Sequence, residues 1–394
     1  MNFGNFPVEI VYSILTEAVL EGDKLIVQAD RLLQNGEARD NMSEPIPIDH
    51  FTTLSELYQS KKHHTKSINV ALEFARYELD EPTPLEVLQI ASGIFQASRL
   101  SPINEVVLWI TIPDLAENTV EFWYHIHPIL ETTTEFGNLT KLEFSFSHTF
   151  WEQETTLAAV ICLLKSLEVI KLCAHKKITE ARRPESQAAL GNSLSSLTRL
   201  ESMSLEGLKS PNPKWTKLNW KSNIKKLSIT NCKSFKDFSS LRSFFNLFHK
   251  SLIALRFNAD ENDCRALEDC GILKSFESLQ QLTIYQNHHR NISILQQFSI
   301  CPAIKFIHWI VSDPHPSKEQ IRSLIFDLLI LKNYQNRWRS LRSLVLPSNF
   351  ANSLDSSTYA ILDVLHILCD NYSVRLSYLD DNEYDVKKHL KFYI

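Results

Sequence analysis

The chain has 394 residues, of which 44% are hydrophobic, so it can bury a sizeable core in one large or two moderate domains. Its formal net charge of -5 excludes the overall basic field typical of nucleic-acid-binding proteins, and the absence of any run of about 18 apolar residues argues against a membrane span. Residues 1–100 carry 15 acidic and 8 basic side chains, whereas the remainder carries 31 and 33, which suggests an acidic N-terminal module on a near-neutral body.

The numbers and positions of the cysteines and glycines indicate the cellular compartment and argue against nucleotide binding. The seven cysteines form no C-x-x-C pair, and their odd number in a long chain indicates reduced intracellular thiols. The N-terminus shows no secretory signal pattern, so we expect a cytoplasmic or nuclear protein. The eight glycines are too dispersed to form a dinucleotide fingerprint or a phosphate-binding loop, so no nucleotide cofactor is expected.

The first predicted element is a helix that begins at Pro7, within the stretch FPVEIVYSIL. Proline is favoured in a first helical turn, where its missing N–H leaves no hydrogen bond unmade. Asn5 can cap this helix, and the negative charge of Glu9 suits its first turn. The apolar residues then share one helical face: Phe6, Ile10, Ile14 and Ala18, with Val11, Leu15 and Val19 beside them. This apolar face is expected to dock either on the rest of the chain or on a partner.

The next thirty residues interrupt the helical pattern. Residues 21–50 combine a short amphipathic piece with a polar, proline-containing loop, and we interpret them as an insertion. A second helix is expected within 51–74, with basic residues at Lys61 and Lys62.

The body of the chain contains internal repeats of the form x-Ser-Leu-x-x-apolar-x-apolar. Four octads match closely, and five segments match loosely. The first apolar residue of each match lies at 103, 139, 167, 200, 224, 252, 279, 304 and 341, so the spacing is 24–37 residues. Helical patterns lie between or after these strands at 155–166, 234–251, 260–276, 317–334 and 355–372. Alternating strands and helices at this spacing predict a solenoid, and the alternative is a non-repetitive α/β fold.

The octads resemble the leucine-rich repeat. In that family an asparagine or cysteine after the strand satisfies backbone groups in the turn, and Cys232, Asn287 and Asn349 occupy this position here. The resemblance covers roughly residues 100–378 and implies an α/β solenoid of irregular leucine-rich repeats with a curved parallel sheet. Trp309 is a candidate inward residue of one strand.

The N-terminal stretch resembles the start of an F-box, whose usual form is L-P-x-E-I-x-x-x-I-L, with phenylalanine in place of the first leucine. The resemblance implies binding to the Skp-type adaptor of an SCF ubiquitin ligase, and through it to the cullin scaffold. The adaptor-binding residues would be Phe6, Pro7, Ile10, Val11, Ile14 and Leu15. The insertion and the missing tryptophan depart from the family pattern, and the alternative is that this helix caps the solenoid.

In a leucine-rich sheet, alternate residues point away from the core toward any ligand. In eight of the strands these residues form a mixed polar ladder: Glu143, Lys171, Ser204, Ser228, Arg256, Thr283, His308 and Val345. Its basic members suggest an acidic or phosphorylated protein substrate, so the candidate substrate-binding residues are Lys171, Lys226, Arg256 and His308.

No pattern in the chain indicates catalysis or metal binding. The histidine pairs 63–64, 125–127 and 288–289 have no adjacent cysteine and are better explained as solvated surface residues. There is no G-x-S-x-G elbow, so we expect neither catalytic residues nor an enzyme. Trp215 and Trp220 lie among five lysines within 214–226, which could suit nucleic acid, but a solvated loop with two surface tryptophans is the preferred interpretation.

These patterns predict three parts: a divergent F-box-like helical module at 1–95 with an insertion at about 21–50, a leucine-rich solenoid at 96–378, and a tail at 379–394. The function implied by the resemblance is substrate recognition in an SCF-type ubiquitin ligase, with an unknown protein substrate and neither nucleic acid nor membrane as a partner. The alternative is a leucine-rich interaction scaffold without ligase association.

Overall fold

The computed structural model divides into two compact units. Unit 1 comprises residues 1–210 and 218–222, and unit 2 comprises 211–217 and 223–394. The described residues are 19–21, 24–28, 66–73, 92, 95–96, 99, 102–111, 119–146, 154–174, 187–208, 211, 213–232, 238–259, 276–286, 298, 300–311, 338–347 and 356–379.

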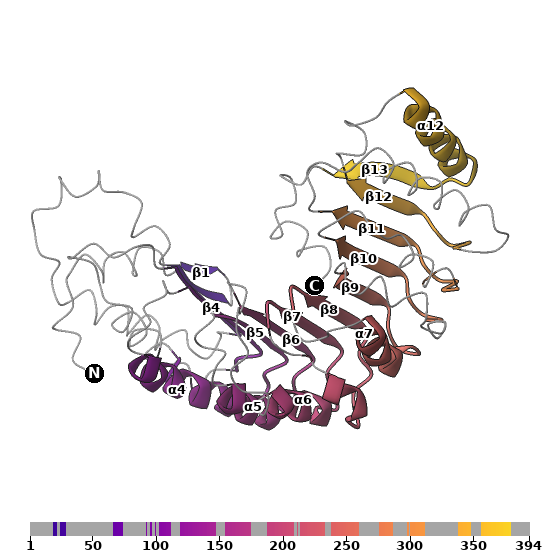
Figure 1. Cartoon of the computed structure of the whole chain (residues 1–394). Helices are drawn as coiled ribbons and strands as arrows, with labels where there is room; N and C mark the ends of the chain where they lie inside the picture. The colour runs from indigo at the N-terminus through magenta and orange to yellow at the C-terminus, as the bar shows by residue number, and fades with distance from the viewer. Residues whose placement is uncertain are drawn as a thin grey trace, which may run out of the picture. The chain divides into compact units, whose positions relative to one another are not determined.

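Unit 1 contains a sheet in which the strands follow one another in sequence order (Figure 1). The short strand β1 (Val19–Glu21) is antiparallel to β2 (Lys24–Gln28), and all later neighbours pair in parallel. The remaining strands are β3 (Ser67–Glu73), β4 (Glu105–Thr111), β5 (Lys141–Phe146), β6 (Val169–Ala174) and β7 (Ser202–Glu206).

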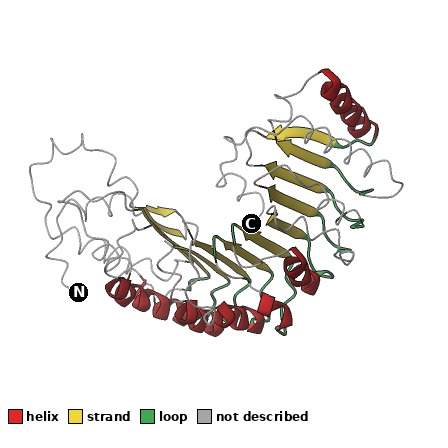
Figure 2. Ribbon diagram, in the orientation of Figure 1, coloured by secondary structure: helices red, strands yellow, loops and turns green. Residues whose placement is uncertain are grey.

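Three helices lie on one side of this sheet in unit 1 (Figure 2). They are α4 (Thr119–Glu135), α5 (Glu154–Leu163) and α6 (Gln187–Ser196). Helix α6 is rich in small residues and packs on α5, where the Ser193 hydroxyl donates a hydrogen bond to the Ala158 carbonyl at 2.7 Å. Small side chains allow this direct contact, which a bulkier helix would prevent.

Unit 2 repeats the arrangement with strands β8 (Lys226–Thr230), β9 (Ala254–Ala259), β10 (Gln281–Gln286), β11 (Phe306–Val311), β12 (Ser343–Pro347) and β13 (Arg375–Leu379). All neighbouring strands in this unit are parallel. The helical elements are η6 (Pro213–Lys217), α7 (Phe238–Phe245), η7 (Asn246–Phe248) and α12 (Ser356–Asn371). Helix α12 packs on β13, where the Tyr378 hydroxyl lies 2.9 Å from Nε2 of His366.

The apolar core of each unit is built from the inward residues of the strands. In β6 every second residue is buried, and Ile170 and Leu172 lie directly opposite Leu142 and Phe144 of β5. Because side chains alternate across a strand, this register places these four apolar residues on the same, helix-covered side of the sheet. Aromatic rings fill the core of unit 2, with centroid separations of 5.2–6.1 Å among Trp215, Phe244, Phe245, Phe248, Phe257, Phe276 and Phe298.

The serine and the leucine of the repeat have separate structural roles. The leucine is buried in each octad, as at Leu167, Leu252 and Leu279. The serine hydroxyl donates to a carbonyl of the preceding repeat, from Ser251 to Ile224 at 2.8 Å and from Ser166 to Gly137 at 3.3 Å. A side chain that bonds the previous repeat satisfies a backbone group that no helix or strand serves.

A recurring pair of backbone hydrogen bonds also joins successive repeats. The amides of Glu168 and Val169 both donate to the Thr140 carbonyl, at 2.8 and 2.9 Å. The same pattern recurs in unit 2 at the steps from β8 to β12, for example from residues 280–281 to the Ile253 carbonyl, whereas at β13 only the Arg375 amide donates, to the Arg342 carbonyl. These bonds fix the register between neighbouring strands just before the sheet begins.

The predicted α/β solenoid is confirmed: strands and helices alternate in repeats, and the strands form a parallel sheet. All nine predicted strands are present, and each begins two residues after the first apolar residue of its repeat. Three predicted helices correspond to α5, α7 and α12, whereas those at 260–276 and 317–334 lie outside the described residues. In the turn after β8, Asn231 adopts a left-handed conformation with φ of 56°, and the Cys232 thiol lies 3.4 Å from the Thr230 carbonyl oxygen. The other two predicted turn residues, Asn287 and Asn349, lie outside the described residues.

The N-terminal part differs from the predicted helical module where the structure describes it. Val19, expected on the helical face, belongs to β1, and the expected helix at 51–74 is replaced at its end by β3. The predicted insertion contains β2, which pairs with β3 in parallel. The predicted boundary at residue 95 therefore does not mark the start of the parallel sheet. The segment 67–73 forms a strand rather than a helix because it carries β-branched residues at alternate positions, Ile68 and Val70, and pairs with a strand on each side.

Candidate binding surface on the strand face

The outward residues of neighbouring strands align in continuous rows. In unit 1 the central row runs from Val107 through Glu143 and Lys171 to Ser204. In unit 2 the corresponding row comprises Ser228, Arg256, Thr283, His308, Val345 and Ser377. This register confirms the polar ladder read from the sequence, because residues of one row share one face of the sheet.

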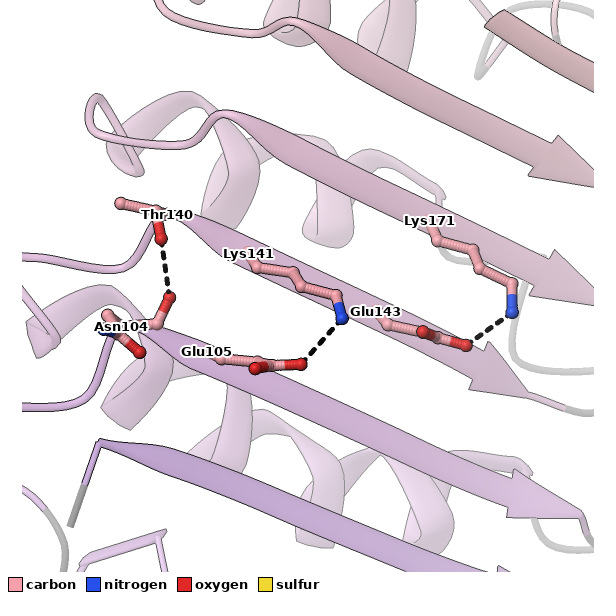
Figure 3. A network of polar contacts seen from close by, with 6 residues as sticks. All are labelled: Asn104, Glu105, Thr140, Lys141, Glu143 and Lys171. Carbon is pink, nitrogen blue, oxygen red and sulfur yellow. Dashed lines mark hydrogen bonds and ion pairs between the residues drawn. The ribbon is translucent and has the colours of Figure 1, made fainter. Parts of the chain in front are cut away.

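In unit 1 the basic side chains of this face are neutralised by acids on the preceding strand (Figure 3). Nζ of Lys171 lies 2.6 Å from Oε1 of Glu143, and the two side chains are only 14% and 12% exposed. Nζ of Lys141 lies 2.7 Å from Oε1 of Glu105, with exposed fractions of 25% and 26%. These cross-strand pairs tie β4 to β5 and β5 to β6, and each pair carries no net charge.

In unit 2 the strand face carries Arg256, which forms no such ion pair with any residue in the described ranges. The guanidinium carbon of Arg256 on β9 lies 4.7 Å from the ring centroid of Tyr285 on β10. The outward positions of β8–β13 include Lys226, His308 and Arg375 and, among the described residues, no aspartate or glutamate. This part of the face is therefore suited to a ligand that carries negative charge.

The thiols near the sheet are unsuited to nucleophilic chemistry. Burial and, to a smaller extent, the neighbouring Glu206 carboxylate together raise the pKa of Cys173 to about 12. Burial likewise raises the pKa of Cys301 to about 11. Because only the thiolate is a strong nucleophile, both groups stay protonated and unreactive near neutral pH.

Among the described residues, no group of three or more histidine, cysteine, aspartate or glutamate side chains could hold a metal ion. His127 is exposed on α4, with Nδ1 3.5 Å from Oε1 of Glu131, while the histidine pairs 63–64 and 288–289 lie outside the described residues. None of the helices in the described ranges is long and apolar enough to cross a membrane.

The two tryptophans predicted to lie at the surface have different positions. Trp215, in η6, is fully buried and packs edge-on against Phe244 at a centroid distance of 6.1 Å, so its predicted surface position is wrong. Trp220 is half-buried. The short helix η6 turns Trp215 inward, which its lysine-rich surroundings did not indicate. By contrast, Trp309 is buried on β11 as predicted.

The predicted site residues fall into two groups. The candidate adaptor-binding residues Phe6, Pro7, Ile10, Val11, Ile14 and Leu15 all lie outside the described residues. The candidate substrate-binding residues all lie on outward strand positions, with Lys171 in unit 1 and Lys226, Arg256 and His308 in unit 2. Whether any of them contacts a substrate stays a prediction.

Two features of the face were not recognised in the sequence. Tyr285 lies two residues after Thr283, so the alternation of the strand was sufficient to place it outward. The pairing of Lys171 with Glu143 joins residues 28 positions apart, and it follows only from the register of the sheet.

Comparison with known proteins gives no close relative. No family model and no curated protein matches this chain. Among solved structures, a chain of the crystal structure of the Rad7 and Elc1 complex in yeast is similar, with a TM-score of 0.42 and 13% sequence identity over 86% of this chain and 84% of that chain.

Proposed function

We propose that this chain is the substrate-recognition subunit of an SCF-type ubiquitin ligase. Its N-terminal segment binds a Skp-type adaptor, which connects it to the cullin scaffold, and its strand face binds a protein substrate. The observation that carries the recognition role is the set of register-aligned outward rows, which present charged and aromatic side chains on a rigid parallel sheet. The ligase association is supported by the resemblance of 6–15 to the F-box start.

In this proposal the chain holds its substrate by proximity and performs no reaction itself. The strand face offers ion pairs, an arginine stacked on a tyrosine, and neutral polar side chains. Such groups bind and orient a protein partner but provide no activated nucleophile. The raised pKa of the Cys173 thiol on this face fits a binding role.

The ligase association is tested by the double substitution Ile10→Asp and Ile14→Asp in the full chain. We expect it to abolish capture of a purified Skp-type adaptor, because each charge buried without a partner costs several kcal/mol, enough to lose a micromolar complex. The matched control is Leu163→Asp with Ile367→Asp, which makes the same change at residues that are 61% and 58% exposed and should leave capture intact. Equal adaptor recovery by wild type and the Ile10/Ile14 variant would reject the ligase role.

The second candidate function is an interaction scaffold without ligase association. It is favoured by β1 and β2, which follow the predicted helix closely and join the sheet at its N-terminal edge. A helix so placed could cap the sheet instead of binding an adaptor. In that case the Ile10/Ile14 variant would lower the thermal stability of the isolated chain, whereas adaptor binding predicts an unchanged melting temperature.

A further inference from the structure

The strand face of unit 2 contains an arginine whose orientation is fixed by an aromatic ring. Arg256 lies opposite Thr283 in the register, so Tyr285, which lies opposite Asn258, is its diagonal neighbour. The guanidinium carbon sits 4.7 Å from the centre of the Tyr285 ring, within the range of a cation–π contact. Such a contact fixes the planar guanidinium before any ligand arrives, so less side-chain freedom is lost on binding.

Within the part of the chain that the structure describes, Arg256 has no acidic partner. Its Nε atom is buried and makes no hydrogen bond, and no carboxylate among the described residues forms an ion pair with the guanidinium. In unit 1, by contrast, Lys141 and Lys171 each meet a glutamate on the neighbouring strand. A partly buried cation without a counter-charge is unfavourable for the free protein, and such violations of local rules mark functional positions.

A second polar group beside Arg256 also lacks a partner. The Asn258 amide nitrogen donates to Oδ1 of Asn231 at 3.1 Å, which fixes the orientation of the Asn258 side chain. The amide oxygen of Asn258 is buried and accepts no hydrogen bond. Because Arg256 and Asn258 are two residues apart on one strand, both lie on the outward face. The pair thus offers a cationic donor and a neutral acceptor, which match the carboxylate and a backbone N–H of one acidic residue.

We propose that Arg256, held against Tyr285, binds the carboxylate of an acidic peptide segment of a partner protein, with Asn258 as the second polar contact. The proposal depends on the proposed function only in taking the strand face to bind the substrate. A phosphate group shares the oxyanion chemistry but is usually held by a cluster of arginines. Here Lys226 lies in another row and His308 lies two strands away, about 10 Å at the usual strand spacing, so a single carboxylate is the better match.

The test measures binding of fluorescein-labelled peptides to the full chain by fluorescence anisotropy at low salt. The probe is a peptide of alternating glutamate and glycine, and two reference peptides carry glutamine or phosphoserine in place of glutamate. We expect the wild type to bind the glutamate peptide. Arg256→Gln should lower the affinity for this peptide at least about tenfold, because it removes a charged hydrogen-bonding partner. Arg256→Lys keeps the positive charge but loses the planar group that stacks on the Tyr285 ring. Its affinity for the glutamate peptide should therefore lie between those of the wild type and Arg256→Gln.

Variants of Tyr285 show whether its aromatic ring orients Arg256 for binding or only supports the fold. Tyr285→Phe keeps the aromatic face and should bind the glutamate peptide nearly as wild type, whereas Tyr285→Leu should weaken it. The matched control is Arg199→Gln, which removes an exposed arginine already paired with Glu168 and should leave affinity unchanged. Thermal melting of each variant shows whether the fold is intact. If Arg256→Gln has a lowered melting temperature, the comparison of wild type with Arg256→Lys still tests the role of the guanidinium.

Four results would overturn the proposal. They are equal affinity of wild type and Arg256→Gln, equal binding of the glutamine peptide, binding of the phosphoserine peptide alone, and binding that appears only when residues 380–394 are removed. The last result would make the acids of the chain's own tail, Asp380, Asp381, Glu383 and Asp385, the occupant. If adaptor capture is unaffected by the Ile10/Ile14 variant while Arg256→Gln loses the peptide, the ligase role fails and the carboxylate site stands.

Discussion

At the residue scale, the two units treat a basic side chain on the strand face in opposite ways. Lys171 is enclosed with Glu143, whereas Arg256 is stacked on Tyr285 without an acid. The sequence predicted that both residues point outward, because alternation within a strand is a local property. It did not predict their partners, because the register between repeats decides which side chains meet. The charge of a repeat face therefore cannot be judged by counting its lysines and arginines.

The Lys171–Glu143 pair gives a stability prediction. Lys171→Met leaves the nearly buried Glu143 carboxylate unpaired, so it should destabilise the chain by about 3–5 kcal/mol, as broken buried ion pairs do. The double variant Lys171→Met with Glu143→Met should recover most of this loss. Denaturant unfolding followed by far-ultraviolet circular dichroism measures both changes.

The control for this pair is Arg199→Met, which breaks the exposed ion pair with Glu168, whose partners are 57% and 39% exposed. Solvent and salt screen such a pair, so its loss should change stability by at most about 1 kcal/mol. Equal effects of Lys171→Met and Arg199→Met would show that the Lys171–Glu143 pair is no better shielded than a surface pair.

At the scale of elements, the strands were more predictable than the helices. The Ser-Leu prefix marks a strand because the leucine is buried in the core, while the serines at 166, 251 and 278 donate a hydrogen bond to the previous repeat. Helices α4 and α6 escaped prediction because α4 contains Pro128 and α6 reads QAALGNSLSS, with little apolar periodicity. Packing against α5 stabilises both, which their own sequences do not reveal.

The inward and outward positions of β10 give the prediction at this scale. Leu282 is buried opposite Leu255, while Thr283 faces outward opposite Arg256. Leu282→Ala should therefore destabilise the chain by about 2–5 kcal/mol through the cavity it leaves, whereas Thr283→Ala should change stability by less than about 1 kcal/mol. Urea unfolding midpoints compare the two variants directly. Similar losses from both would contradict the orientation of β10.

At the scale of the whole molecule, the repeats predicted where the solenoid runs but not where its sheet begins. Strand β3 has no Ser-Leu prefix, and β2 lies in a segment that looked like an insertion, so neither resembled a repeat. Both became strands because each finds a parallel neighbour along most of its length. Pairing partners far apart in sequence determined this part of the fold, and a single sequence records them poorly.

The extent of the sheet leads to the final prediction, which compares two N-terminal deletions. Removing residues 1–95 takes away β1–β3 and exposes the β4 edge, which pairs with β3 from Ser67↔Glu105 to Glu73↔Thr111. It also removes Ile68, which is fully buried. We expect this deletion to lower the melting temperature by at least about 5 °C and to promote aggregation through the open edge.

Removing only residues 1–18 should leave the melting temperature unchanged and abolish adaptor capture, since the proposed adaptor-binding residues lie there. Differential scanning fluorimetry and adaptor pull-down on the two deletions separate these effects. If residues 96–394 melt at the same temperature as the full chain, β1–β3 contribute little to the sheet, and the boundary predicted at residue 95 is the correct description of the protein.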